Sequence, residues 1–124
     1  MGWLSGWTGN AGEADIPAVE CELEPVLMEN ERVEQAYQLV RDLIVFTRRR
    51  MILVDKQGMT GKKTDYHSIP YRSISHFSIE TAGRFDFDAE LKIWLSHAHE
   101  PIIKQFKKDK NVYEIQKTLA EYTT

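Results

Sequence analysis

Two histidines stand out among the residues that could do chemistry. His97 and His99 are separated by one residue, so on a β-strand both side chains would face the same side, as two ligands of one metal ion must. A zinc site needs three or four converging ligands, and the sequence offers only this pair with carboxylates nearby. We therefore expect no metal site here. The neighbouring carboxylates are Asp86, Asp88, Glu90 and Glu100.

Two other patterns that would suggest phosphate binding or catalysis do not have the spacing or the neighbouring residues that such sites require. Gly58 and Gly61 precede Lys62, but a phosphate-binding loop needs four residues between its glycines and a helix after it. Two residues intervene here and a strand is expected to follow, so the segment is predicted to be a hairpin turn. Cys21 lies in no nucleophile signature and is expected to be a small buried side chain. No acid, base and nucleophile can be assigned together and no cofactor is indicated, so we predict a protein without enzymatic activity.

The strongest basic run is Arg48, Arg49 and Arg50, with Lys62 and Lys63 at a later turn. Three arginines between two apolar runs are typical of a solvated hairpin tip or of a contact between protomers. The alternative is a site for the anionic head groups of lipids or for phosphate. Both interpretations place the run at a surface.

Aromatic residues near the N-terminus form a second candidate contact. Trp3 and Trp7 are four residues apart, so one helical turn would bring them, with Leu4 between them, to one face. A packing contact within an assembly, disorder and docking on a membrane surface are all compatible with this pattern. The segment has neither the basic and apolar regions of a signal peptide nor the Ser or Thr of a myristoylation motif, since Gly6 occupies that position. We expect a cytoplasmic protein.

Composition narrows the class of partner. The chain has 124 residues, enough for one domain that folds without a disulfide or a metal. Its 16 Lys and Arg against 19 Asp and Glu give a net charge of −3, which argues against nucleic acid as the main ligand. One cysteine excludes an internal disulfide. No apolar run approaches the roughly 20 residues that a transmembrane helix needs.

The elements that must position these residues can be predicted from hydrophobic periodicity. Residues 1–14 are rich in glycine and are expected to be an N-terminal extension, with a single domain over 15–124. Asp15 is a predicted N-cap, and Val19, Leu23 and Leu27 form one face of a short helix. Alternation then predicts strands at 33–40 and 73–80, and continuous apolar runs predict buried strands at 43–47 and 51–54. Further strands are expected at 62–69, at 91–95 and around 102–106, with Ile74 on the opposite side of its strand from Phe77 and Ile79.

The period becomes helical again near the C-terminus. Asn111 is a predicted N-cap, and Val112, Ile115 and Leu119 make an apolar stripe. About seven strands in successive hairpins imply an antiparallel sheet that closes or folds over, with the terminal helix plugging its open end. The predicted fold class is therefore mainly β (α+β).

Several segments together resemble a known family, the bacterial pleckstrin-homology-like proteins. They are residues 41–47 (RDLIVFT), 52–58 (ILVDKQG), 60–63 (TGKK), 66–71 (YHSIPY) and 88–94 (DAELKIW). The resemblance covers nearly the whole chain from residue 9 to 120. It implies a PH-like barrel of about seven antiparallel strands in two near-orthogonal sheets, capped by a C-terminal α-helix, with a short N-terminal helix.

The same resemblance implies a function by contact. It implies one domain that assembles into a cyclic homo-oligomer, with polar sheet surfaces meeting between protomers, and an unknown protein partner. No catalytic residues come with the family. The chain ends soon after its last helix, which favours the smaller kind of ring, a pentamer. Residues expected to contribute to the interaction surface are Tyr66, His67, Tyr71 and Trp94, together with the three arginines.

Membrane lipid is not expected as the main ligand. In eukaryotic pleckstrin-homology domains, phosphoinositides often bind basic residues around the first hairpin. The corresponding break in this chain is Arg41-Asp42, one cation beside one anion, so that motif is not reproduced.

Overall fold

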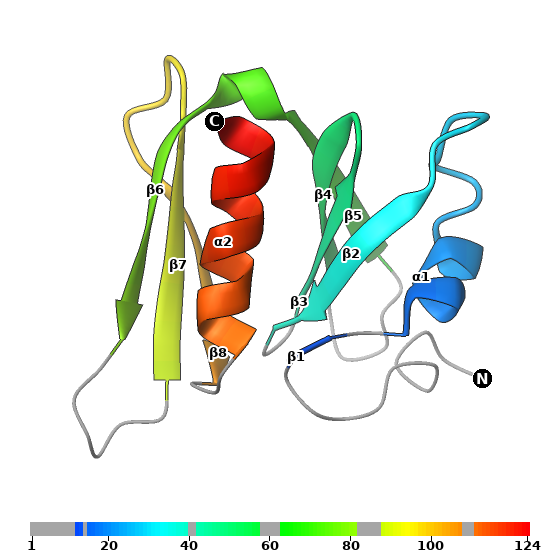
Figure 1. The fold of residues 1–124 in the computed structure, drawn as a ribbon, viewed down its shortest axis with the longest axis horizontal. Helices are drawn as coiled ribbons and strands as arrows, with labels where there is room; N and C mark the ends of the chain where they lie inside the picture. Colours follow the sequence, from blue (N-terminus) through cyan, green and yellow to red (C-terminus); the bar gives the residue numbers. More distant parts are fainter. Residues whose placement is uncertain (1–11, 14, 40–41, 58–62, 82–87, 108–110) are drawn as a thin grey trace.

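The computed structural model describes residues 12–13, 15–39, 42–57, 63–81, 88–107 and 111–124. They form two antiparallel sheets and two α-helices (Figure 1). The mainly β architecture predicted from the sequence, with a short N-terminal helix and a longer C-terminal one, is confirmed, although an unpredicted two-residue strand precedes the short helix. The elements are β1 (Gly12–Glu13), α1 (Ile16–Glu22), β2 (Val33–Gln38), β3 (Asp42–Thr47), β4 (Arg50–Gln57), β5 (Lys63–Pro70), β6 (Ile74–Thr81), β7 (Asp88–Leu95), β8 (Ile102–Lys107) and α2 (Asn111–Thr123).

Strand order follows chain order in both sheets. The first sheet runs β1-β2-β3-β4-β5 and the second runs β6-β7-β8. A one-turn 3-10 helix, Tyr71–Ser73, carries the chain from the first sheet to the second. Figure 1 shows α2 lying between the two sheets, and α1 on the other side of the first sheet.

The continuous apolar runs of β3 and β4 are explained by burial on both faces of the first sheet. Ile44 and Phe46 enter the core between the two sheets and α2, whereas Leu43 and Val45 enter a second core beneath α1. β4 divides in the same way, with Met51 and Leu53 in the first core and Ile52 and Val54 in the second. A strand covered on both sides has no polar face, so its sequence does not alternate.

α1 covers the second core, but it ends before the predicted apolar face does. Val19 of α1 and the C-cap residue Leu23 are fully buried, whereas Leu27 packs against the same cluster from the segment after the helix. Asp15 precedes the helix in an extended conformation, but its side chain makes no capping hydrogen bond. The predicted N-cap position is right, and the predicted capping bond is absent.

One prediction about strand faces is wrong. Ile74, Phe77 and Ile79 all pack against the core between the sheets, although Ile74 was expected on the other side. The pairing of β6 with β7 shifts between Ile74 and His76. A bulge inserts one extra residue into a strand, and this returns Ile74 to the core side.

α2 buries the predicted stripe. Val112, Ile115 and Leu119 are 0–1% exposed and belong to the core between the sheets. The Tyr37 hydroxyl lies 3.2 Å from Thr118 Oγ1 in this interior, so the helix is also tied to β2 by a buried hydrogen bond. Among the described residues, neither helix is long and apolar enough to cross a membrane.

Candidate interaction surfaces

The arginine run does not form one solvated tip. Arg48 and Arg49 are exposed in the turn between β3 and β4, but Arg50 is the first residue of β4 and its side chain is only 18% exposed. Its guanidinium donates to both carboxylate oxygens of Glu31, from Nε to Oε2 at 2.9 Å and from Nη2 to Oε1 at 2.8 Å. Because both oxygens are engaged, this is a bidentate pair, which fixes orientation as well as charge. Arg50 is therefore structural, which corrects its assignment to the interaction surface.

Glu31 is the centre of that network. Its side chain is 1% exposed, and it also accepts hydrogen bonds from the Thr47 hydroxyl at 2.7 Å and from the Met28 backbone N–H at 2.9 Å. Hydrogen bonding by Arg50 outweighs the cost of burial and lowers the pKa of Glu31 to about 2. This carboxylate holds the loop before β2 against the β3–β4 turn.

Tyr71 ties the same turn to the junction between the sheets. Its hydroxyl lies 2.5 Å from the carbonyl oxygen of Thr47 and 2.8 Å from that of Arg50. Its ring stacks on Tyr122 of α2 at 5.0 Å, and burial raises the pKa of the Tyr71 hydroxyl. Tyr71 is half-buried and packs against the core. Tyr71 was expected to be exposed, but its ring is half-buried and its single hydroxyl proton is shared between two backbone carbonyl groups.

Two arginines of the run remain at the surface. Arg48 and Arg49 line a hollow of about 460 Å³ together with Asn30, Arg32 and two glutamates, Glu31 and Glu34. Arg48 Nε lies 3.8 Å from Glu34 Oε2, in an exposed ion pair. Arg32 is paired in turn with Glu20 at 3.0 Å. Three arginines and two glutamates line this hollow, so its charge is mixed and not uniformly positive.

β5 is the most unusual strand of the molecule. It pairs with β4 on one edge, and no described strand pairs with its other edge. Tyr66 and His67 are exposed although their cross-strand partners, Val54 and Leu53, are buried in the two different cores. Only Ile69 is buried in this strand. Within the first sheet both cores therefore end at β4, apart from Ile69. Among the described residues, β5 extends beyond the cores with exposed side chains on both faces and with one edge that no strand pairs.

Trp94 lies on the second sheet and not beside Tyr66. It is partly buried and its ring stacks on His76 across β6 and β7 with 4.4 Å between centroids. Ser75 Oγ lies 2.8 Å from His76 Nδ1. The expected surface residues are therefore distributed over two sheets.

A row of charged residues that no sequence pattern predicted lies where β3 of the first sheet meets β8 of the second. Lys104 of β8 lies 2.8 Å from Asp42 of β3, and both side chains are about one-sixth exposed. Asp42, Asp55 and Asp65 are direct cross-strand neighbours on β3, β4 and β5. Burial, and then the charge of Asp42, raises the pKa of Asp55.

Two further expectations about reactive residues are changed by the structure. Cys21 is exposed, not buried, because residues two apart lie about 200° around a helix and Val19 and Leu23 face the sheet. His97 and His99 lie in a turn after β7, with His97 at a positive φ of 69°, so no strand brings them to one side. Within the described ranges, no group of three His, Cys, Asp or Glu side chains could hold a metal ion.

Some predicted features lie outside the described residues. They are the N-terminal contact of Trp3, Leu4 and Trp7, the turn at 58–62 and the carboxylate Asp86. β4 and β5 pair antiparallel on either side of that turn, and a strand follows it, as a hairpin requires and a phosphate-binding loop does not.

Sequence patterns could not have found the polar network. Glu31 lies in a loop, and Thr47 and Tyr71 lie at element ends, where no periodicity marks a side chain as buried. A weak signal was present in Thr47, the last residue of an otherwise apolar run.

Known proteins are similar to this chain in sequence and in architecture. Residues 2–123 match the family described as Bacterial PH domain. Two Bacillus subtilis proteins are similar: the uncharacterized protein YjqA, at 62% identity with 97% of both chains covered, and the uncharacterized protein YozO, at 36% identity with 82% of this chain and 86% of that one covered.

Two crystal structures agree in fold. The pleckstrin homology domain from Shewanella amazonensis SB2B superposes with a TM-score of 0.81 at 54% identity, covering 99% of both chains. A duf1696 family protein with a pleckstrin-homology domain from Shewanella loihica PV-4 superposes with a TM-score of 0.79 at 50% identity, covering 94% of this chain and 99% of that one. Because the family match extends over nearly its full length and the two sheets and capping helix agree with it, the chain belongs to the bacterial PH domain family.

Proposed function

We propose that this protein is a non-enzymatic scaffold that assembles with copies of itself into a closed ring, a pentamer, and recruits another protein. The observation that carries the proposal is β5, an eight-residue edge strand with exposed side chains on both faces. A long uncovered edge offers unpaired N–H and C=O groups to any other strand. A native protein covers such an edge, and a second copy does so directly.

The composition of β5 favours a specific contact over indiscriminate pairing. Tyr66 supplies an aromatic side chain that is 37% exposed, and Asp65 and His67 supply polar groups beside it. Aromatic residues contribute strongly to the centre of interfaces, and polar residues at their rim set the geometry. A contact between this surface and a different surface of the next copy is head-to-tail, and such contacts form a ring when the rotation closes.

Light scattering coupled to size-exclusion chromatography tests the assembly. We expect a mass of five times the 14.4 kDa of one chain, and a lower mass for Tyr66→Lys, because lysine on an edge strand opposes pairing. Tyr113→Lys is the matched control, since Tyr113 is 53% exposed on α2, away from β5. A wild-type mass of one chain at micromolar concentration would refute the ring.

Anionic lipid is the competing ligand, and we propose that it is not the main one. Arg50 is committed to Glu31, and Glu34 lies beside Arg48, so the hairpin offers little net positive charge to a membrane. Sedimentation with phosphoinositide vesicles at physiological salt distinguishes the two functions. Tight binding that Arg48→Ala and Arg49→Ala remove would favour the lipid.

A further inference from the structure

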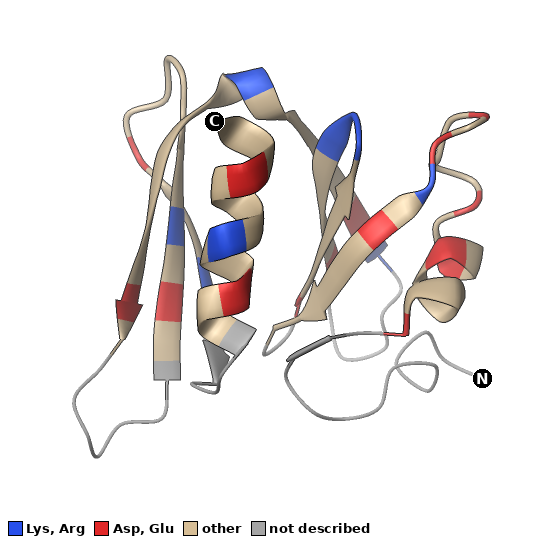
Figure 2. Cartoon of the chain, in the orientation of Figure 1, with Lys and Arg blue, Asp and Glu red and all other residues tan. Residues whose placement is uncertain are grey.

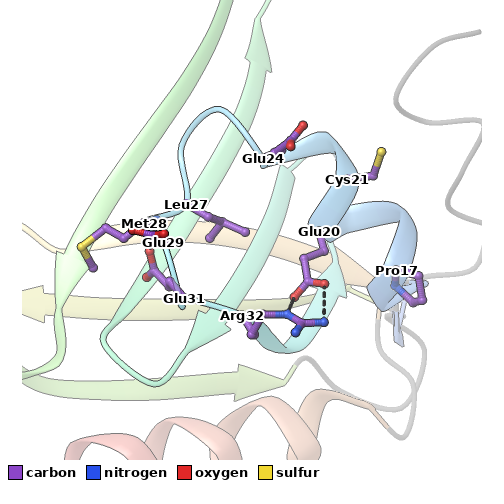
Figure 3. Close-up of a pocket in the computed structure, with 9 residues that line it drawn as sticks. All are labelled: Pro17, Glu20, Cys21, Glu24, Leu27, Met28, Glu29, Glu31 and Arg32. Atoms are coloured by element: carbon purple, nitrogen blue, oxygen red, sulfur yellow. Dashed lines mark hydrogen bonds and ion pairs between the residues drawn. The ribbon is translucent and has the colours of Figure 1, made fainter.

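A groove separates α1 from the segment that follows it. Its volume is about 540 Å³. Figure 3 shows Pro17 and Cys21 on the helix side, and Leu27 and Met28 on the segment after it. Met28 is 47% exposed, unusually open for a large apolar side chain beside other apolar groups. The groove therefore has an apolar lining that the rest of the described chain leaves uncovered.

The rim of this groove is acidic. Glu20, Glu24, Glu29 and Glu31 all line it, but they are not equally available. Glu20 is bound to Arg32 at 3.0 Å, and Glu31 is buried against Arg50. Glu24 and Glu29 are exposed and make no ion pair with a described residue. Two carboxylates at the rim are thus free to meet cations from outside.

Charge is distributed very unevenly along the chain. Seven of the 19 acidic residues and none of the 16 Lys and Arg lie in residues 13–31, so this segment carries −7 and the remainder carries +4. Figure 2 shows acidic positions along α1 and the loop after it. A field of one sign around an apolar groove selects for partners of the opposite sign.

We infer that this groove is a docking site for a cationic peptide segment of another protein, one that carries an apolar side chain between or beside Lys or Arg residues. The apolar side chain packs on Leu27 and Met28, and the cations pair with Glu24 and Glu29. The groove is open to solvent, which suits a peptide segment lying on the surface, whereas small-molecule sites enclose most of their ligand. The inference adds to the proposed function by naming the class of protein that is recruited. It rests on the proposed recruitment of another protein and not on the ring.

Fluorescence anisotropy with a labelled dodecapeptide of alternating Lys-Leu and Gly-Ser pairs tests the inference. We expect micromolar binding that falls at least about fivefold for Glu29→Lys, since the change removes one ion pair and adds repulsion. Glu22→Lys is the matched control, because Glu22 is exposed at the end of α1 and does not line the groove. Equal loss of binding in the two variants would show a general charge effect and overturn the site.

The apolar part of the site is tested separately. Met28→Ser should weaken the same peptide, whereas Ile103→Ser, at an apolar residue 49% exposed on β8, should not. A peptide with Ser in place of Leu should bind more weakly, because it keeps the cations and loses the apolar contact. If it binds as tightly as the Lys-Leu peptide, or if no peptide binds, the inference fails.

Light scattering separates the test of the groove from the test of the ring. The mass of Glu29→Lys should equal the wild-type mass, because the groove is assigned to another protein. A fall in mass would mean that a second copy fills the groove and would contradict the inference. A ring that forms while no peptide binds would contradict the groove alone.

Discussion

At the scale of single residues, Glu31 decides how the β3–β4 turn responds to acid. Its pKa in the folded protein is about 2, against an ordinary value of 4.5. The unfolded chain therefore takes up this proton at a higher pH than the folded protein does. The stability that Glu31 contributes is complete above about pH 4.5 and is lost as the pH falls toward 2.

Glu31→Gln tests this assignment. The amide cannot form the charged bidentate pair and leaves Arg50 buried without its counter-ion, so we expect a loss on the order of 3 kcal/mol at neutral pH. Urea unfolding at several pH values should show a shallower fall of stability between pH 4.5 and 2 than in the wild type.

Glu24→Gln is the control, because Glu24 is exposed. It should change neither the stability nor its pH dependence. An unchanged acid slope in Glu31→Gln would mean that another carboxylate controls acid unfolding.

At the scale of elements, the periodicity of the apolar residues predicted both helices and the strands from β2 to β8, but not β1, which lies in the predicted glycine-rich extension. It located β3 and β4 as buried strands and Val112, Ile115 and Leu119 as the inner face of α2. It failed where one extra residue changes the face, as at the β6 bulge, because a bulge has no signature in hydrophobicity. It also failed for Tyr71 and Arg50, since whether a polar side chain is satisfied inside depends on partners distant in sequence.

α2 offers a direct test of the capping helix. Leu119 is fully buried in the core between the sheets, so Leu119→Asp places an unpaired carboxylate there and should cost several kcal/mol. Thermal unfolding followed by circular dichroism measures the loss. Gln116→Asp, at an exposed position of the same helix, is the control, and equal melting temperatures for the two variants would refute the packing.

At the scale of the whole molecule, the two sheets are held at both ends by different chemistry. One end is closed by the stack of Phe46, Tyr122 and Tyr71, with the Tyr122 hydroxyl hydrogen-bonded to Glu34. The other is closed by Lys104 and Asp42. Asp55 lies beside this pair, and Lys104 opposes the rise of its pKa. One lysine therefore offsets the repulsion between neighbouring carboxylates.

Lys104→Met should destabilise the protein by about 2 kcal/mol at neutral pH, because it leaves partly buried carboxylates unpaired. The loss should shrink as the pH falls toward about 3.8, the ordinary pKa of an aspartate, because the pKa of Asp55 is raised in the folded protein and a protonated carboxyl does not repel. Chemical denaturation at neutral and acid pH measures both effects.

Lys92→Met is the matched control. Lys92 pairs with Glu80 at 3.4 Å, but Glu80 is 67% exposed, and exposed pairs contribute about 1 kcal/mol or less. A loss in Lys104→Met that is independent of pH would show that the lysine acts by packing.

The uneven distribution of charge gives the molecule an electric dipole as well as a small net charge. Its negative end is at α1, and in the field of a nearby charged body the molecule would turn as it approached. This torque acts only within about a Debye length, roughly 8 Å in physiological salt. It would therefore govern how fast and in which orientation a cationic body arrives, and would leave the lifetime of the contact to the apolar groove.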